Sequence, residues 1–187
     1  WRQIQVSSDY NFWDLHIAIQ DSMGWYDCHL HSFNLYKDDK ARRVEIGIPG
    51  DMAEGVIAGW KIPIANYFVN EGEKVEYHYD FGDDWYHEIV FEGIKPKSKS
   101  AKYPKCIGGE RACPPEDCGG VTGYYDLLEV LKKRKGKKYS EMIRWLKNHV
   151  VSYYPYDSNY FDCKKVKFDN PDSRWVLSFR ENISFGE

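Results

Sequence analysis

The sequence predicts an α+β fold with one domain, built on a mixed or antiparallel sheet with helices packed on one face. Two adjacent segments of alternating apolar residues, joined by glycine and aspartate, predict a β-hairpin over residues 74–92. Segments on both sides of that hairpin repeat their apolar residues at helical spacing. The 187 residues suit a single domain that buries a substantial core. We therefore expect one domain over residues 1–187.

The N-terminal part of the chain predicts a strand, a helix and two further strands. WRQIQV, residues 1–6, is typical of the end of a strand. The segment NFWDLHIAIQDSMGW predicts a helix that Asn11 caps and Gly24 ends. HLHSFNLY alternates in polarity and predicts a strand, and RRVEIGIP predicts another. One face of HLHSFNLY carries His29, His31, Phe33 and Leu35.

Strand pairing in the predicted hairpin depends on which faces are apolar. In EKVEYHYDFGDDWYHEIVFEGI, a three-residue turn at residues 82–84 places Phe81 opposite Trp85 and keeps apolar residues paired. A two-residue turn would mix the apolar face with charge. We therefore predict the three-residue turn, with His87 on the apolar face beside Tyr79. The other face would carry His78, Asp80 and Glu88.

Three helices are predicted after the hairpin. Residues 124–134, YYDLLEVLKKR, form an amphipathic pattern with leucines on the inner face. A second helix is expected after Ser140, which can cap it, and His149 lies on its apolar face. A last helix follows Asn170, with Pro171 in its first position.

Composition narrows the classes of function. The net charge of -3 argues against a protein that binds nucleic acid over its whole surface, although local basic patches remain available. The chain has no apolar run near the length of a membrane span, so we expect no membrane partner. The odd number of cysteines, five, and the lack of a visible secretory leader favour reduced thiols in the cytoplasm.

Four long motifs can be compared with known families: HLHSF (29–33), YHYDFGDDWYHEI (77–89), YPKCIGGERACPPEDCGG (103–120) and GYYDLLEVL (123–131). In this order and spacing they resemble the plasmid pRiA4b open-reading-frame-three-like family, from Trp1 to about Val150. The resemblance implies an α+β domain with a mixed sheet, in a family found on plasmids and insertion elements whose function is uncharacterised. Members usually carry a further strand before the WR pair, so the resemblance implies a strand preceding Trp1. It implies no catalytic residues.

Basic side chains predict the leading function, a non-enzymatic binding module. The run KKRKGKK has six cations in seven residues, and smaller lysine groups lie in residues 95–105 and 164–167. If these groups face one way, they form a phosphate-binding patch for nucleic acid; a partner protein is the other expected ligand. The alternative is that cations near a helix C-terminus only complement its dipole. The predicted nucleic-acid-binding residues are Lys132, Lys133, Arg134, Lys135, Lys137 and Lys138.

Carboxylates support a second function, the metal-dependent hydrolysis of phosphate esters. If residues 106–120 fold back over the hairpin, their acidic side chains converge with Glu88, His78 and the aspartates of the turn, a set that suits Mg²⁺ or Mn²⁺. The alternative is structural: the aspartates fill a turn, and the acidic pair after Pro115 caps backbone amides. Arg111 could tie this segment to the hairpin aspartates or bind a phosphate. The candidate catalytic residues are Asp80, Asp83, Asp84, His87, Glu116 and Asp117.

Cysteines and histidines support a third function, a structural zinc domain. The three cysteines of CIGGERACPPEDCGG are separated by six and four residues, and zinc needs a fourth ligand from elsewhere. The alternatives are that the thiols fill space in a glycine-rich loop, or take part in redox chemistry. In each case we expect this segment to be ordered over the hairpin, with any activity where the two meet. The predicted zinc ligands are Cys106, Cys113, Cys118, His29 and His31.

Overall fold

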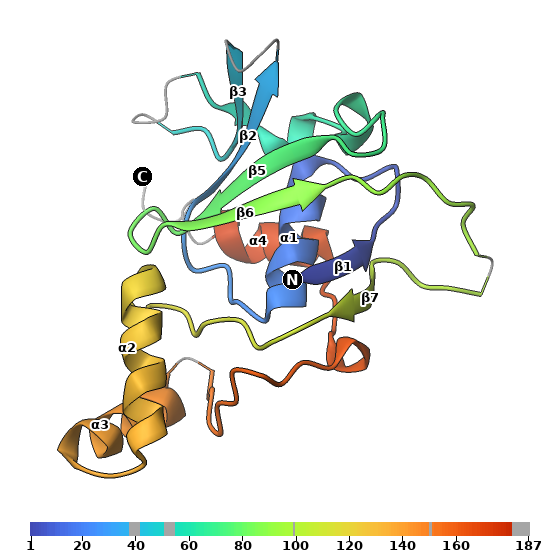
Figure 1. Ribbon diagram of the computed structural model, residues 1–187. Helices are drawn as coiled ribbons and strands as arrows, with labels where there is room; N and C mark the ends of the chain where they lie inside the picture. Colours follow the sequence, from blue (N-terminus) through green and yellow to red (C-terminus); the bar gives the residue numbers. More distant parts are fainter. Residues whose placement is uncertain (38–41, 51–54, 99, 150, 181–187) are drawn as a thin grey trace.

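A computed structural model describes residues 1–37, 42–50, 55–98, 100–149 and 151–180 (Figure 1). Its five-stranded sheet has the order β4-β3-β2-β5-β6. The β3–β4 pair is parallel and the other pairs are antiparallel, so the sheet is mixed. The single-domain α+β fold predicted from the sequence is confirmed. The strands are β2 (His31–Lys37), β3 (Arg42–Gly47), β4 (Ile57–Ala58), β5 (Lys74–Tyr79) and β6 (Trp85–Val90).

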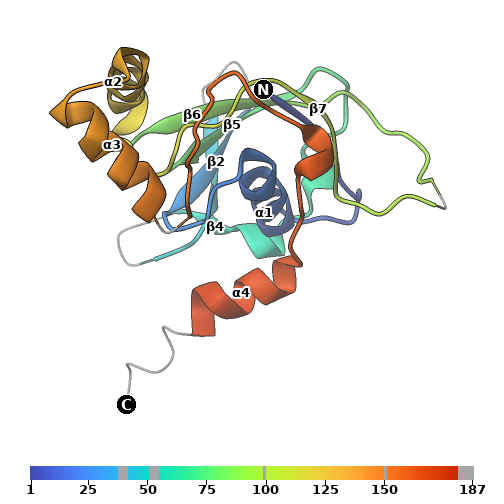
Figure 2. The same ribbon diagram turned by 90° about the horizontal axis from the view of Figure 1, so that it is seen from below.

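Helix α1 (Phe12–Met23) packs against one face of this sheet (Figure 2). Its predicted ends are confirmed: Asn11 and Asp14 form a reciprocal capping box, and Gly24 closes the helix in the left-handed conformation with φ 82°. The core forms between this helix and the sheet, where the Phe12 and Phe33 rings meet with centroids 4.9 Å apart. The helix therefore fixes the inner face of β2 and β5.

The hairpin β5–β6 forms, but its predicted turn is wrong. Tyr79 pairs with Trp85 and Tyr77 with His87, so five residues, 80–84, connect the strands. Asp80 accounts for the longer turn, because its carboxylate accepts the amide N–H groups that follow it and its backbone takes φ 56°. The register differs by two residues, which preserves the faces. His87 therefore lies on the apolar face as predicted, although its partner is Tyr77 rather than Tyr79.

A second, two-stranded sheet pairs two segments that lie far apart in the sequence. Strand β1 (Arg2–Gln5), which the sequence predicts, pairs antiparallel with β7 (Lys105–Gly109), which it does not. Strand β7 contains two glycines and lacks the usual alternation. A Cβ on Gly109 would lie 2.3 Å from the Phe161 ring, so this position accommodates no larger residue without movement. Close packing, rather than strand propensity, explains the composition of β7.

The remaining helices lie at the end of the sheet and beside α1 (Figures 1 and 2). The pair α2 (Gly120–Lys133) and α3 (Lys137–Asn148) extends from the hairpin turn, and α4 (Pro171–Arg180) begins at the predicted proline and packs near α1. Ser140 does not cap α3: the helix begins after Gly136, and the Ser140 hydroxyl donates to the Gly136 carbonyl. Short 3-10 turns are Gly59–Lys61 (η1), Ile64–Asn66 (η2) and Cys163–Lys165 (η3). Over the described residues, every helix is too short or too polar to cross a lipid bilayer.

Candidate functional site

The segment between β7 and α2 is ordered and meets the hairpin at its turn (Figure 1). The Tyr79 hydroxyl donates to the buried Glu116 carboxylate at 2.5 Å, and the Gly119 amide donates to Asp83 Oδ2 at 3.0 Å. A Cβ on Gly120 would lie 2.4 Å from the carbonyl oxygen of Asp83, so the two backbones approach as closely as glycine permits. These contacts hold the start of α2 against the hairpin turn.

Two acidic residues and a histidine meet where the segment crosses the hairpin. His29 Nε2 lies 3.0 Å from Asp117 Oδ1 and 3.6 Å from Asp80 Oδ2. Each of the three residues offers one ligand atom within 4.8 Å of the other two. Asp80 is nearly buried, whereas the side chains of Asp117 and His29 are 54% and 30% exposed, so the group opens to the surface.

A second histidine approaches the same carboxylate from the end of α3. His149 Nε2 lies 3.4 Å from Asp117 Oδ2, so Asp117 stands between two imidazoles. The His149 side chain is 9% exposed, and its Nδ1 atom is buried with no hydrogen-bond partner among the described residues. We call His29, Asp80, Asp117 and His149 the surface cluster.

The backbone fixes both carboxylates of the surface cluster. Asp80 and Asp117 have φ 56° and 55°, a conformation that residues other than glycine rarely adopt. Asp80 is tied in place because its amide donates to the Leu30 carbonyl at 3.0 Å. Glu116, the residue before Asp117, is held because its carboxylate accepts from the Tyr26 amide and the Tyr79 hydroxyl. Backbone conformations of this kind persist only where surrounding contacts impose them, and they concentrate at functional sites.

Two open grooves flank the pair of His149 and Asp117. One, of about 430 Å³, is lined by Arg144, Trp145 and His149. The other, of about 360 Å³, is lined by Asp117, Lys138 and Trp145 among others. Each groove therefore brings a cationic side chain and one member of the surface cluster to the same surface.

Several predicted catalytic residues lie outside the surface cluster. Asp84 pairs with His78 at 2.9 Å, and Glu88 pairs with Lys74 at 3.0 Å. His87 packs edge-on against Trp25 on the apolar face, where burial lowers its pKa. Of the six candidates, only Asp80 and Asp117 come together, with Asp83 and Glu116 as the residues that position them. His87, the histidine predicted for the site, lies elsewhere, and His29 and His149 are the histidines that contact Asp117.

The predicted zinc ligands are not brought together. Among the described residues, no group of three potential ligand atoms within 4.8 Å includes a cysteine. Burial raises the pKa of Cys113, and burial together with Asp83 raises the pKa of Cys118 to about 12. Cys106, like these two, is a free thiol, and His31 lies in the core.

The predicted basic segment is fully on the surface. All six cationic side chains from Lys132 to Lys138 are exposed, at the end of α2, in the connection and at the start of α3. Lys132 pairs with Glu129, and Lys137 approaches Glu141 at 3.8 Å. Arg111 is exposed as well, and within the described part of the chain it makes no ion pair with the hairpin aspartates.

Sequence reasoning missed His149 as a member of the site. Its position on the apolar face of a predicted helix indicated a packing role, and it does contact Trp145 with ring centroids 5.1 Å apart. The available signal was that the helix ends at this residue, where a side chain can turn toward a neighbouring loop. Nothing local to the sequence indicates that this loop contains Asp117.

Comparisons with known proteins agree with this fold. The family described as plasmid pRiA4b ORF-3-like protein matches residues 1–165. The uncharacterized protein y4hQ of Sinorhizobium fredii is 32% identical over 133 residues, which cover 70% of this chain and 65% of that protein. The crystal structure of MM3350 from Methanosarcina mazei, a protein of unknown function, matches with a TM-score of 0.77 and 39% identity, over 90% of this chain and 89% of that one. The chain belongs to the plasmid pRiA4b ORF-3-like family.

Proposed function

We propose that the chain is a divalent-cation-dependent hydrolase of phosphate esters, with the cation held by His29, Asp80 and Asp117. The observation that carries this proposal is the convergence of their three ligand atoms within 4.8 Å at the surface. Two carboxylates and an imidazole suit Mn²⁺ better than Mg²⁺, because imidazole is a poor ligand for the harder ion. Support comes from the adjoining grooves, which are lined by the cationic side chains of Lys138 and Arg144 as well as by Glu141.

The chemistry follows from these groups. A divalent cation held by His29, Asp80 and Asp117 would polarise a phosphoryl oxygen and make water a better nucleophile. The water oxygen attacks phosphorus, the ester P–O bond breaks, and the proton released from water passes to the leaving oxygen. His149 would hold that proton, since its Nε2 atom lies 3.4 Å from the proposed ligand Asp117. Arg144 and Lys138 would neutralise charge on the phosphate.

The substitution Asp117→Asn tests the proposed hydrolase. We expect Mn²⁺-dependent hydrolysis of para-nitrophenyl phosphate or its diester by the unaltered protein. In Asp117→Asn the rate of hydrolysis should fall at least about 100-fold, because a proposed ligand of the cation, which also pairs with both histidines, is lost. Asp84→Asn is the matched control: it removes an exposed carboxylate that pairs with a histidine of the same hairpin but lies outside the cluster. Purified protein that neither binds Mn²⁺ nor hydrolyses either ester would end this proposal.

A second candidate function, nucleic-acid binding, is favoured by the exposed basic segment. Four of its cations, Lys133, Arg134, Lys135 and Lys138, have no carboxylate partner among the described residues. We predict that affinity for a DNA duplex falls steeply with added salt, and that changing Lys132, Lys133 and Arg134 to alanine flattens this dependence, because each lost phosphate contact lowers the slope by about one. A fluorescence-anisotropy titration measures both. Binding that ignores salt would exclude this function and leave a partner protein as the ligand of the segment.

The thiols bear on the compartment in which the protein works. All five cysteines are free, and burial raises the pKa of Cys113 and Cys118. Free thiols persist in a reducing compartment. We therefore propose that the protein acts in the cytoplasm.

A further inference from the structure

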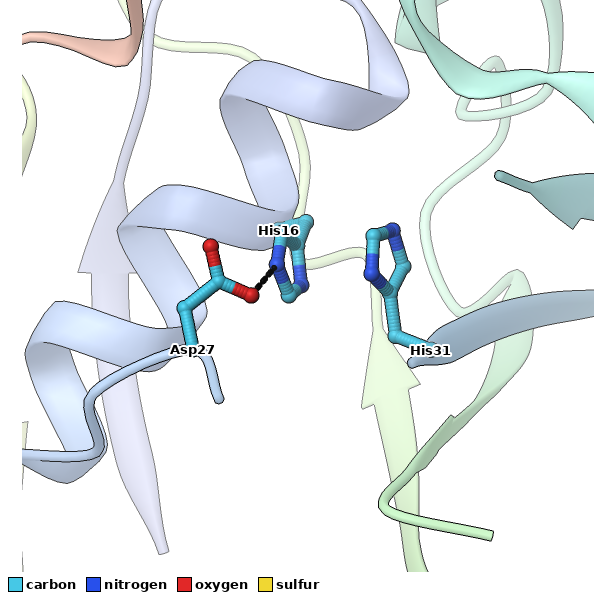
Figure 3. Close-up of side chains that lie close together, drawn as sticks. All are labelled: His16, Asp27 and His31. Atoms are coloured by element: carbon cyan, nitrogen blue, oxygen red, sulfur yellow. Dashed lines mark hydrogen bonds and ion pairs between the residues drawn. The ribbon is translucent and has the colours of Figure 1, made fainter. Parts of the chain in front are cut away.

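A second cluster of titratable groups lies between α1 and the start of β2, and it shares no residue with the surface cluster (Figure 3). His16 Nε2 lies 2.7 Å from Asp27 Oδ1, and His16 Nδ1 lies 2.8 Å from the Tyr77 hydroxyl. The His31 ring stacks on the His16 ring, with centroids 3.4 Å apart and planes within 10°. We call His16, Asp27 and His31 the buried cluster.

Two polar atoms of the buried cluster have no hydrogen-bond partner among the described residues. These are Asp27 Oδ2 and His31 Nδ1, each with almost no exposed surface. His31 is 3% exposed, and the Asp27 side chain is 7% exposed. Figure 3 shows a ring nitrogen of His31 on the side that faces His16. Unsatisfied buried polar atoms are costly and call for an explanation such as a bound ion.

The hydrogen bonds around His16 define its protonation. Gln20 donates to the Tyr77 oxygen at 2.8 Å, which leaves the Tyr77 hydroxyl proton to be donated to His16 Nδ1. His16 is then neutral with its proton on Nε2, facing Asp27. Burial lowers the pKa of both His16 and His31 well below the usual value, so both rings are neutral, the form in which imidazole binds metal.

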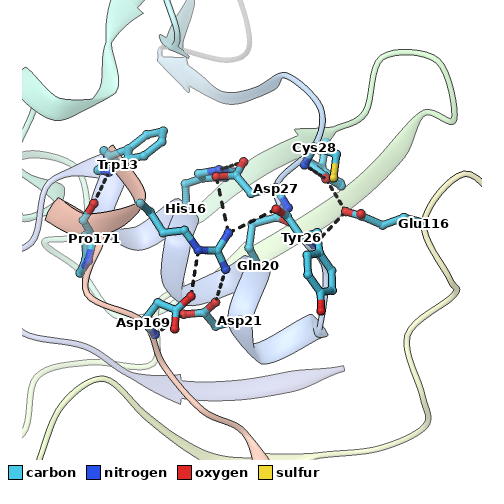
Figure 4. Close-up of polar contacts among 12 residues, drawn as sticks. Trp13, His16, Gln20, Asp21, Tyr26, Asp27, Cys28, Glu116, Asp169 and Pro171 are labelled. Carbon is cyan, nitrogen blue, oxygen red and sulfur yellow. Dashed lines mark hydrogen bonds and ion pairs between the residues drawn. The ribbon is translucent and has the colours of Figure 1, made fainter. Parts of the chain in front are cut away.

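The surroundings carry more buried negative charge than positive charge. Arg174 of α4 pairs with Asp21 at 2.9 Å and lies 4.0 Å from Asp27 Oδ2. The side chains of Asp21 and Asp27 are 5% and 7% exposed, so one guanidinium faces two buried carboxylates, and the exposed Asp169 makes a third (Figure 4). Burial raises the pKa of Asp27 to about 6, as expected for a carboxylate with incomplete compensation.

We propose that His16, Asp27 and His31 form a buried binding site for a divalent transition-metal ion, with zinc as the ion of first choice. Each residue offers one ligand atom within 4.8 Å of the others, and two imidazoles with one carboxylate are a ligand set that zinc accepts. Tyr77 supplies the outer hydrogen bond that orients His16. Zinc binding through His16 Nε2 requires the ring proton to move to Nδ1, from which it is donated to the Tyr77 oxygen while the Tyr77 hydroxyl proton turns away. It also requires the stacked His31 ring to rotate, because parallel rings do not point at one ion.

Helix α4 encloses this site. Trp13 lies over His16 with ring centroids 5.4 Å apart, and Trp175 and Phe179 of α4 pack on Trp13. In the metal-free protein, Arg174 supplies the positive charge nearest to Asp27. A metal ion therefore takes over the role of compensating Asp27, and the site involves none of the residues of the surface cluster.

Zinc titration in an Asp117→Asn background, which removes one proposed ligand of the surface cluster, tests this site. We expect one zinc ion per chain after gel filtration, by elemental analysis, and a melting temperature raised by roughly 5–10 °C at zinc a hundredfold above Kd. Adding His31→Gln should weaken zinc binding by about 100-fold or more in isothermal titration, because a ligand is lost. His87→Gln is the matched control, since His87 is another neutral histidine packed on the inner face of the sheet but outside the cluster.

Two outcomes would overturn the zinc site. One is Asp117→Asn protein that retains no zinc and gains no thermal stability, which would leave the cluster as a hydrogen-bonded core network. The other is zinc binding that His31→Gln leaves unchanged. If His31→Gln does not fold, Asp27→Asn is measured in the same way, because it preserves shape while removing the charge. Co²⁺ gives an independent readout: visible absorption bands should appear in the Asp117→Asn protein and disappear when zinc is added.

Discussion

At the scale of single residues, the described structure divides its histidines by environment. His29 and His149 face Asp117 near solvent, whereas His16 and His31 are stacked in the core. The first pair lies beside the exposed carboxylate of Asp117, whereas the second pair is enclosed in the core. Burial keeps the second pair neutral, because removing an imidazole from water disfavours its charged form.

The buried histidine His31 predicts a dependence of stability on pH. Its pKa in the folded state lies well below 6.5, so the unfolded state binds more protons, and the stability that His31 contributes is complete above pH 6.5 and lost as the pH falls below it. We expect the difference in unfolding free energy between the unaltered protein and His31→Gln to shrink by about 1.4 kcal/mol per pH unit below 6.5. Urea unfolding of both proteins from pH 7.5 to 5.0 measures it. A constant difference would show that folding leaves the pKa of His31 unshifted.

At the scale of elements, the contact between the hairpin turn and the start of α2 positions the surface cluster. The turn is longer than the sequence suggests because Asp80 satisfies its amides, and this length brings Asp83 to Gly119. Glu116 then fixes the preceding segment by accepting from Tyr79. The cluster is thus assembled by a junction of two loops held by a rigid hairpin, an arrangement common at functional sites.

The close approach of Gly120 to Asp83 predicts that a larger residue at position 120 destabilises the protein. Gly120→Ala should destabilise the protein by about 2 kcal/mol or more, because the new methyl group meets the Asp83 carbonyl and the residue has φ 63°. Gly136→Ala is the control: it has φ 93° but nothing within 4 Å of an added Cβ, so it reports backbone strain alone. Chemical denaturation compares the two. Equal costs for both substitutions would mean that the junction yields easily and does not fix the cluster.

At the scale of the whole molecule, local patterns predict the fold better than the site. The capping residue Asn11, the stop at Gly24 and the alternation around Tyr77 are encoded within a few positions, so α1 and the hairpin could be predicted. Strand β7 could not, because it is defined by pairing with β1 about a hundred residues away in sequence. The surface cluster shares that property, because its four residues come from four separate segments. Asp80 and Asp117 could be predicted as carboxylates of loops and His29 as a metal ligand, but their meeting with one another and with His149 could not.

A crystal of the protein soaked in Mn²⁺ tests the central claim most directly, by anomalous diffraction. We predict one strong anomalous peak at the surface cluster, within roughly 2.0–2.6 Å of His29 Nε2 and of one carboxylate oxygen from each of Asp80 and Asp117. No peak there, with Asp117 still paired to both histidines, would contradict the proposal that this family member is a metal-dependent hydrolase.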